Sequence, residues 1–352
     1  MTSIFNPRNL GNSDLVVSSI CMGTMTYGQQ NSYQDACNQL DYAKEFGVNF
    51  LDTAELYAIP PKPETQGATE EIIGEYLQER GSRHEWIVAT KVIGRSGHMD
   101  WFRDGNVLPK LDAANIEEAL HKSLKRLRTD VIDLYQIHWP DREIPMFGSS
   151  HGYRHSDNHG IAIEETLTAL ARFVEQGKIR HIGISNETAW GAMTYIALAD
   201  KMGLPRIVSI QNAYNLLNRT YEYGLSEVSL RENISCLPYA PMAAGTLSGK
   251  YLDGQRPAGS RKALFDRVER YEKDGTDQAV RSYIQLAQDH GLTPGQLALA
   301  FCHGRDFVTS SIIGATTMEQ LQHNLEAFRI NLDDDILDAI EAIHLQQPNP
   351  CP

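Results

Sequence analysis

The sequence contains few cysteines, and they follow neither a disulfide pattern nor a zinc-binding pattern. The five in this chain of 352 residues are Cys21, Cys37, Cys236, Cys302 and Cys351. They are widely spaced, odd in number and include no C-x-x-C pair, which argues against a disulfide framework and against a zinc ribbon. Few, unpaired cysteines are typical of proteins in a reducing compartment, so we expect a cytoplasmic location.

Long apolar runs and concentrated positive charge are also missing. No uninterrupted apolar segment approaches the roughly 18 residues that are needed to cross a bilayer, and residues 1–10 lack the basic and apolar stretches of a secretory signal. A formal net charge of -13, without a cluster of Lys and Arg, disfavours binding to phosphate backbones. We therefore expect a soluble protein whose partners include neither a membrane nor nucleic acid.

Short apolar runs alternate with longer segments of helical periodicity, which is typical of a parallel sheet covered by helices. The expected strands are 17–22, 49–53, 86–92, 132–138, 181–185, 207–211, 234–240 and 311–314. Amphipathic helices are expected at 115–127 and 163–176, with an added C-terminal helix at 332–344. Eight such units predict an α/β fold, a (β/α)8 TIM barrel that occupies residues 1–352 as one domain. The rival doubly wound sheet lacks its G-x-G-x-x-G turn.

Two segments interrupt the alternation, and both follow expected strands. Residues 58–68 are rich in proline, whereas residues 141–160 are rich in Gly, Ser and His. Loops at this end of a barrel surround its substrate, so we expect extended loops that form pocket walls. The spacing of His151, His155 and His159 also fits metal ligands on a helix, but the residues around them favour a loop, and no metal is expected.

Polar residues stand where three of the expected strands end. Asp52, Lys91 and His138 close or interrupt apolar runs, and Tyr57 follows Asp52 by five residues. A buried lysine needs an acidic partner, which Asp52 on the neighbouring strand would provide. A purely structural ion pair and a tyrosine that merely packs are the alternatives.

Together these four residues suit the reduction of a carbonyl group. Hydride addition leaves an alkoxide that needs a proton, and a phenol can supply one when a nearby cation eases its loss. Tyr57 would be the donor, Lys91 the cation and Asp52 the group that holds Lys91. His138 would donate a hydrogen bond to the substrate oxygen.

The segments 52–57 (DTAELY), 89–91 (ATK) and 136–138 (QIH) resemble the catalytic tetrad segments of aldo-keto reductases. The resemblance extends through nearly the whole chain, and the segments 60–67 (PPKPETQG) and 123–127 (SLKRL) are most similar to bacterial Tas-type members. It implies an NADP(H)-dependent oxidoreductase whose substrate is a small aldehyde or ketone. Substrate identity and oligomeric state are left open. Met25, Tyr27, Trp101 and Trp139 are expected near the pocket or in the packing around it.

The resemblance also implies a set of cofactor-binding residues. Ser185, Asn186 and Gln211 match the group that holds the nicotinamide amide, and Tyr239 matches the ring that stacks on nicotinamide, although an aromatic residue on a strand is otherwise usually core. The full set is Gly23, Thr24, Met25, Asp52, Ser185, Asn186, Gln211, Tyr239, Ala240, Pro241, Met242, Ala243, Gly245, Lys250, Arg261, Gly314, Ala315, Thr316, Gln320 and Asn324. Ala240 replaces a frequent serine of the family.

Phosphate contacts are expected at two places. Residues 245–250 superficially resemble a P-loop, but Tyr251 stands where magnesium would need Ser or Thr, so we reject that interpretation. By resemblance Lys250 and Arg261 contact phosphate, with exposed solvated charge as the alternative. Residues 314–317 begin a helix whose free N–H groups favour an anion, yet Gln320 replaces an arginine that some relatives use there, which weakens the expected preference for NADPH over NADH.

A second class of function is compatible with the same residues. The superfamily includes potassium-channel β subunits that hold NADPH, so a regulatory or redox-sensing subunit with little turnover is the alternative to an enzyme. The intact set of proton-donor residues favours the enzyme.

Overall fold

Eight parallel strands form one curled sheet in the computed structural model, which describes residues 7–149, 152–156 and 158–352. Their order is β10-β3-β4-β5-β6-β7-β8-β9. The bounds are β3 Ile20–Gly23, β4 Phe50–Asp52, β5 Ile87–Val92, β6 Ile132–Ile137, β7 Ile179–Ser185, β8 Ile207–Gln211, β9 Ser235–Cys236 and β10 Ser311–Ile313. Hydrogen bonds from Ile312 N–H to the Pro238 carbonyl (2.9 Å) and from Thr309 N–H to the Cys236 carbonyl (3.0 Å) close the barrel. The predicted (β/α)8 fold is confirmed.

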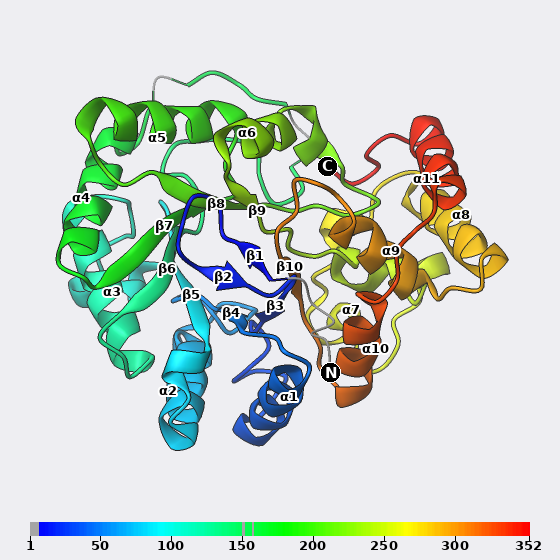
Figure 1. Cartoon of the computed structure of the whole chain (residues 1–352), viewed down its shortest axis with the longest axis horizontal. Helices are drawn as coiled ribbons and strands as arrows, with labels where there is room; N and C mark the ends of the chain where they lie inside the picture. Colours follow the sequence, from blue (N-terminus) through cyan, green and yellow to red (C-terminus); the bar gives the residue numbers. More distant parts are fainter. Residues whose placement is uncertain (1–6, 150–151, 157) are drawn as a thin grey trace.

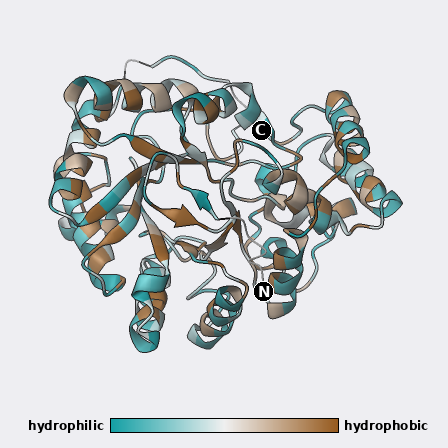
Figure 2. Ribbon diagram, viewed as in Figure 1, coloured by the Kyte–Doolittle hydropathy of each residue, from teal (hydrophilic) through white to brown (hydrophobic). Residues whose placement is uncertain are grey.

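Helices surround the sheet on its outside (Figure 1). They are α1 Tyr33–Glu45, α2 Ala68–Arg80, α3 Ala113–Arg126, α4 Ile163–Glu175, α5 Ala189–Met202, α6 Leu225–Glu232, α7 Arg261–Phe265, α8 Thr276–Asp289, α9 Pro294–His303, α10 Met318–Ala327 and α11 Asp334–Gln346. Side-chain caps begin several of them: Ser32 accepts from Asp35 N–H in α1, and Asp112 accepts from Asn115 N–H in α3. The barrel strands are largely hydrophobic, whereas the helices carry many hydrophilic residues (Figure 2), as expected for helices that cover a buried parallel sheet.

Two of the predicted strands were wrong in their extent. The segment 17–22 divides, because Val16–Val17 (β2) pairs antiparallel with Arg8–Asn9 (β1) and only Ile20–Gly23 joins the barrel. Ser18 separates them, since its N–H donates to the Asn49 side chain and its hydroxyl donates to the Ile20 carbonyl. The segment 234–240 retains only two strand residues, and the chain then turns at Ala240, where φ is +52°.

The short hairpin of β1 and β2 closes one end of the barrel. Leu10, Leu15 and Val17 pack against inward side chains near the amino ends of the barrel strands, among them Phe50 and Val208. These apolar side chains fill the barrel interior at the amino ends of its strands. The carboxyl ends of the strands are thereby left as the face on which polar groups can gather.

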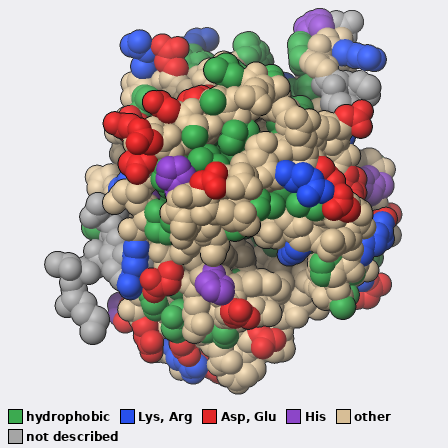
Figure 3. Space-filling model, turned by 90° about the vertical axis from the view of Figure 1, so that its right-hand side faces the viewer, with side chains coloured by type: hydrophobic (Ala, Val, Ile, Leu, Met, Phe, Trp, Pro, Cys, Tyr) green, Lys and Arg blue, Asp and Glu red, His purple; other side chains and the backbone are tan. Residues whose placement is uncertain are grey.

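The helical predictions agree with the structure to within two residues at each end: 115–127 corresponds to α3, 163–176 to α4 and 332–344 to α11. None of the described helices is long and apolar enough to cross a membrane. On the side where α8 and α11 lie in Figure 1, basic, acidic and apolar side chains are interspersed on the surface (Figure 3). No single kind of side chain covers that face.

Candidate active site

Neighbouring strands bring Asp52 and Lys91 together inside the carboxyl end of the barrel. Lys91 lies on β5 and its Nζ is 2.6 Å from Asp52 Oδ2 at the end of β4. Nζ also donates to the Thr53 carbonyl at 2.8 Å, and the Lys91 side chain is fully buried. Burial alone would lower the pKa of Lys91, but the Asp52 carboxylate and the Tyr57 hydroxyl outweigh burial and raise the pKa. Lys91 is therefore held as a cation.

The Tyr57 hydroxyl lies within reach of that cation. Lys91 Nζ donates to Tyr57 Oη at 3.4 Å, and it lies 4.8 Å from the centre of the tyrosine ring. The loop is held by hydrogen bonds from Tyr57 N–H to the Ala54 carbonyl (3.0 Å) and from Gly67 N–H to the Tyr57 carbonyl (2.8 Å). Burial raises the pKa of Tyr57, and the charge of Lys91 opposes this rise. Tyr57 thus keeps its proton at neutral pH beside a group that stabilises the phenolate.

His138 follows β6 and completes the group that the sequence predicted. Its ring meets the Tyr57 ring edge to face, with centroids 5.7 Å apart. Burial lowers the pKa of His138 well below its ordinary value, and the nearby charge of Lys91 lowers it further. Nδ1 is buried and has no hydrogen-bond partner among the described residues. A neutral imidazole carries one N–H and can donate it to a substrate oxygen.

Two glutamines hold the second oxygen of Asp52. Gln211, the last residue of β8, donates from Nε2 to Asp52 Oδ1 at 2.8 Å, and Gln136 on β6 donates to the same oxygen at 3.1 Å. The sequence analysis predicted Gln211 as a cofactor contact and did not identify Gln136 as a contact of Asp52. Its position two residues before His138, near the end of a buried strand, was the available signal. These amides fix Asp52, and Asp52 in turn fixes Lys91.

The residues predicted to hold nicotinamide are linked to His138. Asn186 Nδ2 donates to the His138 carbonyl at 2.9 Å, and the Tyr239 hydroxyl donates to Asn186 Oδ1 at 2.7 Å. The Ser185 hydroxyl donates to the Gln211 carbonyl at 2.6 Å. The ends of β7 and β8 and the segment after β9 therefore form one polar rim. Residues 240–243 continue it, with positive φ at Ala240 and Ala243.

Two predicted phosphate contacts lie on the segment between β9 and α8. Lys250 Nζ packs so close to Gly245 that a β-carbon at Gly245 would lie 2.8 Å from it. Arg261 begins α7, and burial lowers its pKa, as do the nearby Arg267 and Arg270. Neither Lys250 nor Arg261 has a carboxylate partner within the part of the chain that the structure describes. Both cations are available to an anion.

The start of α10 differs from the expectation of free N–H groups. Thr316 N–H donates to Gln320 Oε1 at 2.9 Å, and Gln320 N–H donates to the Thr317 hydroxyl at 3.2 Å. Asn324 Nδ2 donates to the Gly314 carbonyl at 3.2 Å. The expectation was wrong for Thr316, because the flexible amide of Gln320 folds back and caps the helix itself. An anion would have to displace that amide.

The remaining predicted positions lie around β3 and the loops. Gly23 ends β3, where a β-carbon would come within 2.7 Å of the Ile312 side chain. Thr24 donates from its hydroxyl to the Asp52 carbonyl at 2.8 Å, and the Met25 carbonyl accepts from Ile59 N–H. Ala315 lies with Gly314 between β10 and α10. Tyr27 is fully buried and its hydroxyl donates to Gln39, so it is a packing residue.

The histidine-rich segment is a loop, as its composition suggested. His155 and His159 lie in irregular structure with ring centroids 6.3 Å apart, whereas His151 lies outside the described residues. Among the described residues, no group of three or more potential metal ligands gathers there or elsewhere. Trp139 lies beside His138, with ring centroids 5.0 Å apart, and Trp101 packs in the same apolar cluster.

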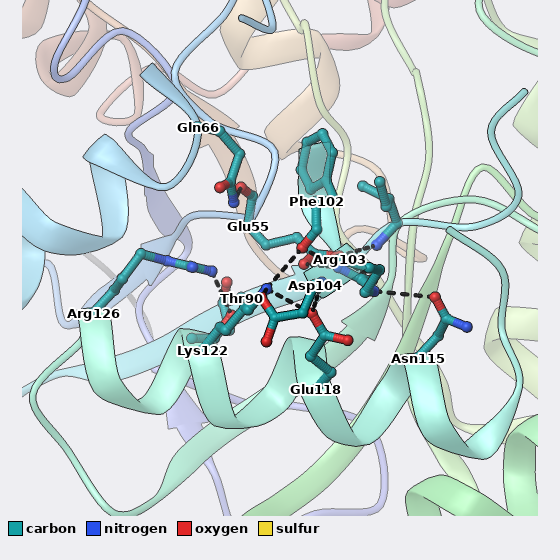
Figure 4. Close-up of polar contacts among 12 residues, drawn as sticks. Glu55, Gln66, Thr90, Phe102, Arg103, Asp104, Asn115, Glu118, Lys122 and Arg126 are labelled. Carbon is teal, nitrogen blue, oxygen red and sulfur yellow. Dashed lines mark hydrogen bonds and ion pairs between the residues drawn. The ribbon is translucent and has the colours of Figure 1, made fainter. Parts of the chain in front are cut away.

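Two buried ion pairs behind the site escaped sequence reasoning. Glu55, between Asp52 and Tyr57, binds Arg103 through both carboxylate oxygens at 2.8 and 3.0 Å. Arg103 also donates to Asn115 at 3.2 Å on α3 (Figure 4). Arg126 of the same helix binds Glu70 at 2.6 Å. The only sequence signal for the first pair was the charge of Glu55 within the segment 52–57. Its partner Arg103 is 48 residues away in the chain, so the pairing itself could not be predicted.

Comparisons with known proteins were made for the whole sequence. The model of the Aldo/keto reductase family matches residues 19–344. The chain is similar to "Protein tas" of Escherichia coli (strain K12), at 50% identity over 348 residues that cover 98% of this chain and 99% of the relative. An "Aldo-keto reductase" of Babesia bovis is 38% identical over 280 residues, or 75% of this chain and 97% of the relative. A "Probable voltage-gated potassium channel subunit beta" of Arabidopsis thaliana is 31% identical over 355 residues, covering 97% of each chain.

Proposed function

The chain belongs to the aldo/keto reductase family, and from that premise we propose that it is an NADP(H)-dependent oxidoreductase that reduces aldehydes or ketones to alcohols. The observation that carries the proposal is the 3.4 Å contact between Lys91 Nζ and Tyr57 Oη, next to the neutral ring of His138. A phenol can act as the general acid that protonates a carbonyl oxygen when a cation lies at its own oxygen and a second hydrogen-bond donor lies beside it.

In this proposal Tyr57 gives its proton to the carbonyl oxygen as the carbonyl carbon is reduced. The cofactor supplies the hydride, so that carbonyl, hydride and proton together balance to the alcohol. Lys91 stabilises the phenolate that remains, and Asp52 with its two glutamines keeps Lys91 aimed at it. His138 donates a hydrogen bond to the same substrate oxygen and stabilises its developing charge.

The chain's own residues fit a dinucleotide phosphate on the same face. Lys250 and Arg261 are cations without carboxylate partners among the described residues, and Gly245, against which Lys250 packs, has a φ of +94° that favours glycine. We propose that they contact cofactor phosphate, that Asn186, Ser185 and Gln211 hold the nicotinamide amide, and that the Tyr239 ring lies against nicotinamide. The other predicted positions around β3, β9 and α10 would line the same groove. All five cysteines are buried free thiols, which suits the proposed cytoplasmic location.

An NADPH-binding regulatory subunit is the second candidate, and the similarity to proteins described as potassium-channel β subunits favours it. A screen of NADPH oxidation across aldehydes and ketones, run beside fluorescence titrations with NADPH and NADH, separates the two. We expect steady turnover of several aldehydes. Tight binding of NADPH without turnover would instead support the regulatory subunit, and a failure to bind either nucleotide would exclude both.

A further inference from the structure

Arg270 stands out as a partly buried cation at the rim of the proposed site. It belongs to the short helix η8, Glu269–Tyr271, and its Nη1 donates to the Tyr239 hydroxyl at 3.1 Å. Its guanidinium lies 5.6 Å from the centre of the Tyr239 ring and 5.5 Å from that of Phe147. Within the described part of the chain it forms no ion pair. Its contacts are two aromatic rings and one hydroxyl group, none of which carries a negative charge.

Two chains of contacts join Arg270 to the catalytic histidine. One runs through the Tyr239 hydroxyl and the Asn186 amide to the His138 carbonyl. The other runs through Phe147, whose ring meets Trp139 at 5.9 Å, and Trp139 lies 5.0 Å from the His138 ring. Both chains start at the guanidinium and end at the same histidine. Arg270 is therefore connected to the proposed catalytic histidine by two independent series of contacts.

The surroundings of Arg270 differ from those of the proposed phosphate contacts. Gly148 packs on its stem, where a β-carbon would lie 2.6 Å from Arg270 Cγ, so the loop that follows β6 covers this arginine. Lys250 instead packs on Gly245, near the segment that follows β9. The loop after β6 also contributes Met146, Phe147 and Trp139, which are apolar. Arg270 thus lies on the side of the site that faces the substrate loops.

We propose that Arg270 binds an anionic group of the substrate, so that the preferred carbonyl compounds carry a carboxylate. This inference rests on the proposed reductase function. The planar guanidinium matches a carboxylate through two parallel hydrogen bonds. Trp139 and Phe147 contact the apolar body between carboxylate and carbonyl, while His138 and Tyr57 meet the carbonyl oxygen.

The test compares 4-carboxybenzaldehyde with its neutral methyl ester, using the full chain and NADPH. We expect the wild type to prefer the acid. Arg270→Gln should lower kcat/KM for the acid by about tenfold or more, mainly through KM, because a charge-assisted hydrogen bond is lost. The loss for the ester should be clearly smaller than the loss for the acid, and Arg270→Lys should restore part of the preference. Arg267→Gln, an exposed arginine on the same segment, is the matched control and should leave the preference unchanged.

A second measurement separates this subsite from the reductase function. Binding of benzoate to the protein with NADP+ is followed by the fluorescence of the pocket tryptophans, which requires no turnover, and Arg270→Gln should weaken it. If no aldehyde is reduced but benzoate binding still depends on Arg270, the reductase function fails and the anion subsite stands. An unchanged preference for acid over ester in Arg270→Gln would overturn the subsite. Loss of NADPH affinity with that preference intact would do the same, because Arg270 would then be a cofactor contact.

Discussion

The buried cations around β4 to β6 differ from those on the segment between β9 and α8. Near β4 to β6, Lys91 pairs with Asp52, Arg103 with Glu55 and Arg126 with Glu70. On the segment after β9, Lys262 pairs with Glu272, but the half-buried Lys250, Arg261 and Arg270 have no carboxylate partner among the described residues. In the first region each of these cations is balanced by a carboxylate of the protein, whereas three cations of the second are not.

The difference separates two uses of buried charge. A paired charge fixes the position of the chain, because breaking the pair leaves one ion desolvated. An unpaired cation keeps its electrostatic attraction for a ligand that brings the missing anion. We therefore interpret the region around β4 to β6 as a rigid proton-donating unit and the segment after β9 as a set of anion contacts.

The largest expected effect is that of Tyr57→Phe on catalysis. Loss of the proton donor should lower kcat for aldehyde reduction by about 100- to 10,000-fold, the usual range for a general acid. NADPH affinity, measured by fluorescence titration, should stay the same because the hydroxyl acts on the substrate oxygen. Undiminished turnover would show that Tyr57 is not the donor.

The next effect concerns stability. Glu55→Leu leaves Arg103 buried without its partner, which should lower the free energy of unfolding by about 3–5 kcal/mol in denaturant melts. Arg281→Ala, which breaks the exposed pair with Asp253, is the control and should cost about 0–1 kcal/mol. Equal losses in the two variants would contradict the distinction between buried and exposed pairs.

Removal of an unpaired cation should affect binding instead. Lys250→Ala and Arg261→Ala should each weaken NADPH binding by about tenfold or more, because each loses a charge-assisted contact with phosphate. The unfolding free energy should hardly change. Arg281→Ala, an exposed arginine that is already paired, is the control for nonspecific charge effects. Variants that bind NADPH as tightly as the wild type would remove both residues from the proposed groove.

The smallest effect is a dependence of stability on pH. Burial lowers the pKa of His303 from 6.5 to about 4, with a further contribution from Arg8. The unfolded chain therefore takes up a proton at this histidine below pH 6.5, whereas the folded chain does not until pH approaches 4. Stability should be level above pH 6.5 and fall below it. Between pH 7 and pH 5, the free energy of unfolding of His303→Gln should fall by about 1 kcal/mol less than that of the wild type. Equal decreases in the two proteins would show that His303 does not contribute to the pH dependence.

Much of the fold could be predicted because it depends on periodicity. Apolar runs such as 207–211 agree with the structure to the residue, and the amphipathic pattern located α3 and α4. The extents of the first and seventh strands were wrong, because the pairing of Val16–Val17 with Arg8–Asn9 depends on contacts across the barrel floor. Periodicity describes one element at a time and contains no information about its partner.

The members of the proposed catalytic group could be singled out from the sequence, since polar residues at the ends of apolar strands are costly unless they are used, and the structure brings these residues together. Their partners could not be singled out in this way. Arg103 is separated from Glu55 by 48 residues, and the Gln320 amide caps its own helix by a choice of side-chain conformation. Such pairings depend on where loops return, which local propensity does not determine.

The sequence by itself determined the barrel, the family and the residues Asp52, Tyr57, Lys91 and His138, because each follows from local pattern or motif. Tertiary structure alone decided which charges are neutralised and which remain unpaired, as with Arg103 and Arg270. The physical reason is that Coulombic attraction depends on distance in space and on burial, and neither quantity can be read from separation along the chain.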